Sequence, residues 1–85
     1  MKDFNMLTLG QLLYDLNDSY THFDVYEQTD DHIPFRRQIL SNASQDEIVE
    51  FSKDHLLDEV LLAYNDLVYR SSGNKIHIVL AKKSE

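Results

Sequence analysis

The 85-residue sequence is long enough for one small domain and too short for a second hydrophobic core. Its apolar content of 42% and aromatic content of 11% suffice for a folded core and argue against disorder. The absence of cysteine excludes disulfides, zinc sites with thiolate ligands and cysteine nucleophiles. Fifteen acidic against eight basic residues give a net charge of −7, which opposes nucleic acid and anionic lipid as direct partners.

The sequence predicts neither a membrane span nor a signal peptide. No run of about 18 apolar residues occurs, and charged side chains stand within the first five residues. We therefore expect a cytoplasmic protein with no membrane partner.

A helix is predicted over residues 8–16. Thr8 is placed to act as its N-cap, and Gln11 three residues later would complete a capping box. Leucines at positions 9, 12, 13 and 16 recur with helical spacing, so they predict one buried face.

Two strands are predicted next, over residues 21–28 and 35–40. In the first, Phe23 and Val25 alternate with polar side chains, which is typical of a strand with one buried face. Residues 29–32 are polar and predict the turn between the two strands.

A second helix is predicted to begin at Ser44, where Glu47 completes a capping box and Ile48 faces the core. Its outer face repeats acidic residues at intervals of three, four and four, which would align them along one helical stripe. The stripe consists of Glu47, Glu50, Asp54 and Asp58.

Residues 57–70 fit two interpretations. Their apolar spacing allows the second helix to continue to residue 70, whereas their alternation allows a strand. Residues 71–74 predict a turn with Gly73 available for positive φ, and residues 75–82 predict a strand that needs a partner. We therefore favour the strand. The predicted fold is a single α+β domain over residues 1–85, α-β-β-α-β-β, with a four-stranded antiparallel sheet and helices on one face.

Four short segments, spread over most of the chain between residues 7 and 80, carry a resemblance to a known group of proteins. They are Leu7-Thr8-Leu9-Gly10-Gln11-Leu12-Leu13, Phe23-Asp24-Val25-Tyr26, Leu57-Asp58-Glu59-Val60 through Tyr64, and Lys75-Ile76-His77-Ile78-Val79-Leu80. In this order they resemble small acidic proteins of Gram-positive phages and mobile elements, a largely uncharacterised group that acts in the host cytoplasm. The longer turn at residues 71–74 departs from the group's usual tight turn. Proteins of this general kind include anti-CRISPR inhibitors, some of which mimic duplex DNA; the resemblance assigns no site residue.

No catalytic residue, cofactor site or metal site is predicted, and we expect no enzyme. Two glycines are too few for a phosphate-binding loop or a dinucleotide fingerprint. The four histidines stand in four different elements, so a zinc site would need to be assembled entirely by tertiary contacts. Asp30 and Asp31 predict an ordinary acidic turn, because the other oxygen ligands and the glycine of a calcium loop are missing.

Charge patterning supplies the functional hypothesis. Residues 1–34 and 44–69 each contain seven acids and one base. We expect an inhibitor-like interaction domain that docks on the basic groove of a nucleic-acid-binding protein, with a CRISPR effector nuclease as a candidate partner. Tyr26 is also expected to bind the partner, because tyrosine is enriched at binding hot spots. The expected partner-binding residues are Glu47, Glu50, Asp54 and Asp58 first, then Asp24, Glu27, Asp30, Asp31 and Tyr26.

Two alternatives are weighed against docking. The chain could be a non-catalytic assembly protein that oligomerises through its sheet or residues 57–69, so that a monomer and a small homo-oligomer both stay open. A regulator that binds DNA directly is disfavoured because its bases are few. The bases that could still form a local patch are Arg36, Arg37, Lys75, Lys82 and Lys83.

Overall fold

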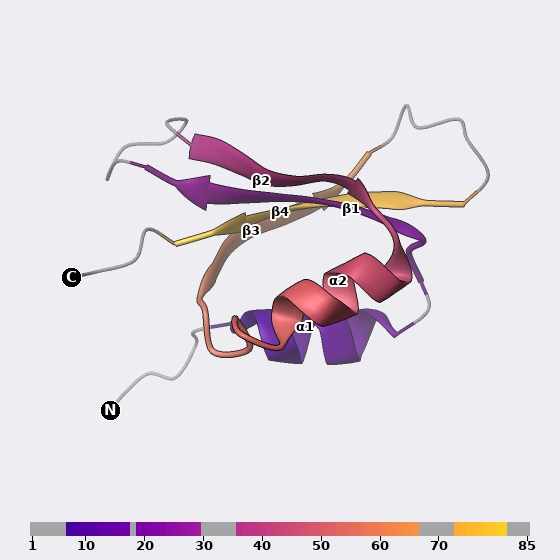
Figure 1. The fold of residues 1–85 in the computed structure, drawn as a ribbon, viewed down its shortest axis with the longest axis horizontal. Helices are drawn as coiled ribbons and strands as arrows, with labels where there is room; N and C mark the ends of the chain where they lie inside the picture. Colours follow the sequence, from indigo (N-terminus) through magenta and orange to yellow (C-terminus); the bar gives the residue numbers. More distant parts are fainter. Residues whose placement is uncertain (1–6, 18, 30–35, 67–72, 82–85) are drawn as a thin grey trace.

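The computed structural model describes residues 7–17, 19–29, 36–66 and 73–81. Four strands form one sheet, and both helices pack against the same face of it (Figure 1). This confirms the expected α+β class with a four-stranded sheet and two helices. The elements along the chain are α1 (Leu9–Leu16), β1 (His22–Gln28), β2 (Arg36–Ala43), α2 (Gln45–Ser52), β3 (Val60–Asn65) and β4 (Lys75–Leu80).

The sheet is mixed, so the prediction of a wholly antiparallel sheet is wrong. Its strand order is β2-β1-β4-β3, and the central pair β1 and β4 is parallel from His22 opposite Lys75 to Glu27 opposite Leu80. The two outer pairs are antiparallel. Parallel neighbours need a long crossover, which the intervening β2, α2 and β3 together provide. Apolar alternation reveals which face of a strand is buried, but it does not reveal the direction of its neighbour.

The strand interpretation of residues 57–70 is confirmed for the described part of this segment. The alternative prediction, that the second helix continues to residue 70, is wrong. β3 covers Val60–Asn65, while residues 67–70 lie outside the described ranges. α2 ends at Ser52, and the chain then turns through residues 53–57. The carbonyls of Leu56 and Asp58 in this connection accept hydrogen bonds of 2.9 Å from the first backbone N–H groups of α1. The connection is thereby held at a helix N-terminus, where unpaired donors require partners.

The helix starts follow the sequence signals closely. Ser44 and Glu47 form both halves of the predicted capping box at α2. At α1 the Thr8 side chain accepts from the Gln11 backbone N–H, but the Gln11 side chain donates to Asp15 at 2.9 Å. The predicted return contact of this capping box, from the Gln11 side chain to the Thr8 backbone, is therefore wrong.

Gly10 allows α1 and the α2–β3 connection to approach closely. A Cβ atom at this position would lie 3.1 Å from the Leu56 carbonyl oxygen and 3.2 Å from a Leu56 methyl carbon. Because Gly10 has no side chain, its backbone N–H can approach and bond to the Leu56 carbonyl.

The core lies between the helices and the central strands. Leu9 of α1 and Ile48 of α2 are completely buried, and they face a sheet surface that includes Phe23, Val25 and Ile78. Neither described helix is long and apolar enough to cross a membrane.

We predict that Ile78→Ala lowers the free energy of unfolding by about 2–5 kcal/mol, because the fully buried side chain leaves a cavity when truncated. Ile39→Ala is the matched control, since Ile39 is 36% exposed; it should cost about 1 kcal/mol or less. Urea unfolding of both variants measures the difference. Equal losses would contradict this placement of the core.

Candidate functional site

The four carboxylates predicted to form one helical stripe do not share a helix. α2 ends at Ser52, so Asp54 and Asp58 lie in the connection that follows it. The Ser52 hydroxyl donates to the Val49 carbonyl at 2.8 Å at the end of the helix. The predicted stripe is wrong because the helical period ends at Ser52.

Exposed acids nevertheless gather around α2. The Glu47 carboxylate accepts the Ser44 backbone N–H at 2.8 Å, which occupies part of its hydrogen-bonding capacity. Glu50 pairs with Lys53 at 3.1 Å, but both side chains are well exposed and such pairs contribute little stability. We call the exposed carboxylates of this segment the α2 acidic surface, which consists of Asp46, Glu47, Glu50 and Asp54.

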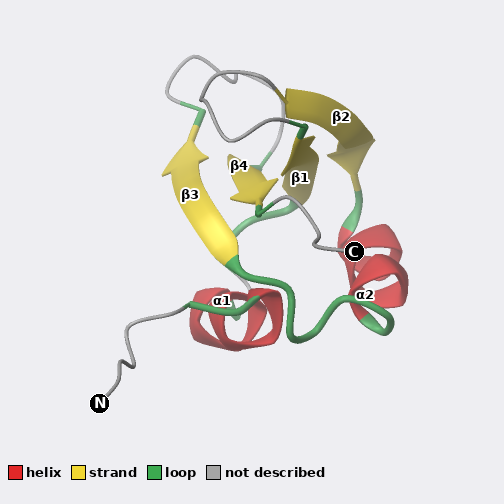
Figure 2. Cartoon of the chain, turned by 90° about the vertical axis from the view of Figure 1, so that its left-hand side faces the viewer, coloured by secondary structure: helices red, strands yellow, loops and turns green. Residues whose placement is uncertain are grey.

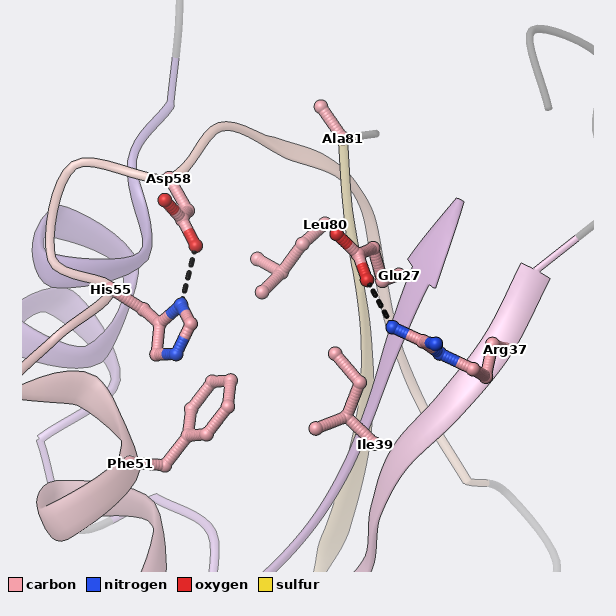
Figure 3. A pocket seen from close by; sticks show the side chains of 8 residues that line it. All are labelled: Glu27, Arg37, Ile39, Phe51, His55, Asp58, Leu80 and Ala81. Atoms are coloured by element: carbon pink, nitrogen blue, oxygen red, sulfur yellow. Dashed lines mark hydrogen bonds and ion pairs between the residues drawn. The ribbon is translucent and has the colours of Figure 1, made fainter. Parts of the chain in front are cut away.

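Glu27 and Asp58, two more of the predicted binding residues, line a pocket of about 290 Å³ between the end of α2 and the strands (Figure 3). On one wall the Asp58 carboxylate lies 2.7 Å from His55 Nδ1. On the opposite wall Glu27 pairs with Arg37 at 2.8 Å. Tertiary structure therefore joins acids from the two separate acidic blocks of the sequence.

The pocket combines these polar pairs with an apolar surface. The Phe51 and His55 rings stack with centroids 4.1 Å apart, which fixes the imidazole beside Asp58. Ile39 and Leu80 complete the apolar part of the lining. The described lining contains no hydroxyl or thiol.

Asp24 lies on the opposite face of the sheet and is buried, with 5% of its surface exposed. One carboxylate oxygen accepts the Asn42 backbone N–H, at 2.6 Å. The other lies 3.2 Å from Lys75 Nζ and 3.3 Å from His77 Nδ1. A buried carboxylate requires such partners, and this pairing removes Asp24 from the accessible acidic surface.

An irregularity in β2 explains the contact with Asn42. The register between β1 and β2 shifts on both sides of Val25, and Asn42 has a φ of 57°. A β-bulge leaves one residue without its regular ladder partner and bends the strand. The Asp24 carboxylate accepts the backbone N–H of Asn42 within this bulge.

His77 connects two acids on this face. Its Nδ1 faces Asp24 and its Nε2 lies 3.3 Å from Asp66, just after β3. The Tyr26 hydroxyl also lies 3.2 Å from Nδ1. We call this group the Asp24 network; it consists of Asp24, Tyr26, Asp66, Lys75 and His77.

Aromatic stacking accompanies the network. His77 stacks against Tyr64 with centroids 4.9 Å apart and against Tyr26 at 6.0 Å. Arg36 lies 4.8 Å above the Tyr26 ring and donates to the Tyr64 hydroxyl at 3.3 Å. Arg36 belongs to β2 and Tyr64 to β3, so this hydrogen bond joins the two outermost strands. Figure 2 shows the curvature of the sheet that makes the contact possible.

Tyr26 stays protonated well into the alkaline range. Burial raises the pKa of its phenol above the ordinary value, and the Asp24 carboxylate and Tyr64 add to this increase. The charge of Arg36 lowers the pKa of Tyr26, but the net shift stays upward. The hydroxyl is therefore a stable hydrogen-bond donor within the Asp24 network.

The basic patch considered for DNA binding is divided in the described part of the chain. Arg36 contacts Tyr26, Arg37 pairs with Glu27, and Lys75 pairs with Asp24. Lys82 and Lys83 lie outside the described residues, as do the predicted binding residues Asp30 and Asp31. No group of acids and histidines suited to a metal ion occurs among the described residues.

Sequence reasoning missed the Asp24 network as a unit. Alternation correctly placed Asp24 and Tyr26 on one face of the first strand, and His77 on the less apolar face of the last. Their meeting depends on the parallel pairing that places Asp24 opposite His77, which the expected antiparallel sheet did not contain. The buried state of Asp24 is the signal that only the tertiary structure supplies.

Comparison with known proteins finds no matching family, no matching curated protein and no matching solved structure. The geometry of the chain itself therefore carries the functional argument.

We predict that Asp24→Ala lowers the free energy of unfolding by about 3 kcal/mol or more, since it leaves Lys75, His77 and the Asn42 N–H without this acceptor. Asp54→Ala removes an exposed carboxylate and should change stability by about 0.5 kcal/mol or less. Denaturant unfolding compares the two. A loss at Asp24 no larger than at Asp54 would show that the network does not stabilise the fold.

We predict that wild-type stability falls as the pH rises above about 10, with a shallower fall in Tyr26→Phe. The raised pKa of Tyr26 means that the folded chain holds this proton more tightly than the unfolded chain does, so stability decreases where only the unfolded phenol ionises. Below that range the contribution is fully present. Chemical unfolding at a series of pH values measures the slopes. Tyr14→Phe, at an 81% exposed position, should follow the wild type.

Proposed function

We propose that this protein is a non-catalytic, acidic interaction domain that docks on the nucleic-acid-binding surface of another protein. The observation that carries the proposal is the α2 acidic surface, where four carboxylates are exposed and Lys53 is the one cation of α2 and the turn behind it. A cationic cleft would meet a surface there whose negative charge exceeds its positive charge by three.

The distribution of cations between the two layers supports this orientation. Three of the four cations in the described ranges lie on strands, where each contacts a carboxylate or an aromatic ring. α1 contributes the exposed Asp15 and no cation to the helical layer. The helical side of the molecule, seen beneath the sheet in Figures 1 and 2, is therefore its more acidic side.

The spacing of the acids is comparable to that of phosphates. A helix rises about 1.5 Å per residue, so the carboxylates of Asp46, Glu47 and Glu50 occupy about 6 Å along α2. Their mean separation of about 3 Å along the axis is close to the roughly 3.4 Å between charges on one DNA strand. The surface would thus compete with a short stretch of nucleic-acid backbone for the same cationic groups.

The pocket adds a second feature beside the acidic surface. Asp58 and Glu27 line it together with Phe51, so a side chain entering from a partner would meet two carboxylates, each already paired with a basic side chain, and an aromatic face. The partner class that we propose first is a CRISPR effector nuclease, in keeping with the resemblance to small acidic phage proteins. Docking of this kind would exclude DNA by competition.

The test is displacement of a labelled DNA duplex from a guide-loaded CRISPR effector nuclease, with a histone-type DNA-binding protein as a second probe. We expect the wild type to displace DNA, with weaker displacement as salt rises because exposed charges are screened over about 8 Å at physiological ionic strength. The combined variant Asp46→Asn, Glu50→Gln and Asp54→Asn should displace DNA about 10-fold less effectively, as expected for three charges worth a few tenths to 1 kcal/mol each.

The matched control raises the net charge by the same three units on β2 and just after β1. Thr29→Lys, Gln38→Lys and Ser41→Lys are at exposed positions and leave α2 unchanged. This control should keep most of the displacing activity if the position of the charge matters rather than its sum. Failure of the wild type to displace DNA from either probe would overturn the proposal, as would equal activity of the two triple variants.

A further inference from the structure

The helical layer exposes large apolar side chains. Tyr14 of α1 is 81% exposed, and Val49 of α2 is 48% exposed. Leu56, in the connection that follows α2, is 50% exposed. Single exposed apolar residues are ordinary on a protein surface, whereas several that lie together indicate a binding surface. The three residues belong neither to the α2 acidic surface nor to the pocket beside Asp58, so their mutual placement is a separate question.

The two helices lie side by side beneath the sheet and flank a groove (Figure 2). Near the end of α1, Leu13 and Tyr14 line a cavity of about 550 Å³ together with Gln45, the first residue of α2. Near the start of α1, the Gly10 backbone N–H donates to the carbonyl of Leu56, which follows α2, at 2.9 Å. The end of α1 therefore lies beside the start of α2, and the two helices run in opposite directions.

Helical spacing places the exposed apolar side chains on this groove. Val49 lies four residues after Gln45, so the two share one face of α2. Tyr14 likewise lies four residues after Gly10 in α1. The Leu56 side chain lies close to Gly10, so it belongs to the same surface. We call this surface the helical groove; it consists of Leu13, Tyr14, Gln45, Val49 and Leu56.

The margin of the helical groove is negatively charged. Asp15 is among the residues that line its cavity, and Asp46 and Glu50 are exposed on α2, directly after the two groove residues of that helix. Lys53 pairs with Glu50 at 3.1 Å and offsets one of these charges. An apolar centre with an acidic margin complements an apolar stripe that is flanked by lysine or arginine.

We propose that the helical groove binds a cationic amphipathic helix of the protein on which this domain docks. The inference rests on the proposed function and names the element of the partner that is held. The apolar stripe of that helix would cover Tyr14, Val49 and Leu56, while its cations would face the acidic margin. α1 and α2 each span eight residues, about 12 Å, so a partner helix of two to three turns would fill the groove.

The walls of the groove favour a helix over an extended segment. Backbone groups within a helix bond to one another, so α1 and α2 offer an incoming chain few backbone partners along the groove. An extended segment would leave its own backbone groups unpaired there, whereas a helix satisfies its own and contributes only side chains. Neither described helix of this chain contains lysine or arginine, so a second copy would not supply a cationic helix from α1 or α2.

Two synthetic peptides with the same content of leucine, lysine and alanine test the proposal. In one, the leucines recur at helical spacing with lysines on both flanks; in the other, the order is shuffled so that no face is apolar. Each has about 16 residues, long enough to form a helix. Fluorescence anisotropy at physiological ionic strength should give micromolar affinity for the amphipathic peptide and about 10-fold weaker binding of the shuffled one. An acidic surface alone would attract both equally, because their charges are the same.

Val49→Lys and Leu62→Lys form a matched pair of variants at exposed apolar positions. Leu62 is 42% exposed on β3, two residues before Tyr64, so it lies on the sheet face away from the helices. Val49→Lys should weaken binding of the amphipathic peptide about 10-fold, because it removes an apolar contact and places a cation among the peptide's lysines. Leu62→Lys should bind like the wild type. Both variants change the net charge equally, so the comparison isolates position.

Amide chemical shifts locate the bound peptide. The largest changes on titration with the amphipathic peptide should occur in the helical groove, at Tyr14, Gln45 and Val49. Changes centred instead on Phe51 and His55 would place the peptide in the pocket beside Asp58 and overturn the proposal.

Equal binding of the two peptides also overturns the proposal, as does an equal loss of affinity in the two lysine variants. A wild-type dimer that Val49→Lys abolishes in sedimentation equilibrium would assign the groove to a second copy and overturn it as well. Failure of docking is a different result, namely a wild type that does not displace DNA from the effector nuclease. If the wild type displaces DNA and Val49→Lys does so as strongly as Leu62→Lys, docking stands and the groove proposal fails.

Discussion

The arrangement of this small sheet depends on the buried carboxylate of Asp24. It accepts a backbone N–H from the bulge of β2 on one side and lies against Lys75 and His77 of β4 on the other. One side chain on β1 therefore ties together three neighbouring strands. Because an unpaired charge at such a site is costly, these contacts favour the register in which all partners meet. The parallel pairing of β1 with β4 is part of the same arrangement.

Much of the local structure follows from short-range signals in the sequence. Thr8 and Ser44 mark the helix starts, and Phe23, Val25, Ile76 and Ile78 mark the buried faces of the strands. These features depend on neighbours a few residues away, so local rules describe them well. The direction of the central pairing and the end of α2 at Ser52 depend on distant partners, and for that reason sequence patterns predicted both wrongly.

In the candidate site, too, local rules describe some residues, and contacts with distant partners decide the others. Exposure of Glu47, Glu50 and Asp54 agrees with the expected solvated acidic face, because exposed polar positions require no specific partner. The fates of Asp24 and Glu27 could not be read from spacing, since each is paired with a side chain on another strand. Asp58 pairs with His55 in the turn after α2, where the predicted helical stripe no longer applies. Acidic composition alone overstates the accessible negative charge, and tertiary pairing concentrates what remains around α2.

The parallel pairing of β1 and β4 also affects when the chain can fold. His22 and Lys75 are neighbours in the sheet but are separated by more than half of the sequence. During synthesis, β1 emerges long before its central partner exists, so the middle of the sheet closes only after the intervening residues and β4 have been made. Pairing over such a separation carries a large loop-closure entropy and slows folding. Until β4 arrives, the apolar faces of β1 and α1 lack their cover, and exposed apolar surface of this kind promotes aggregation.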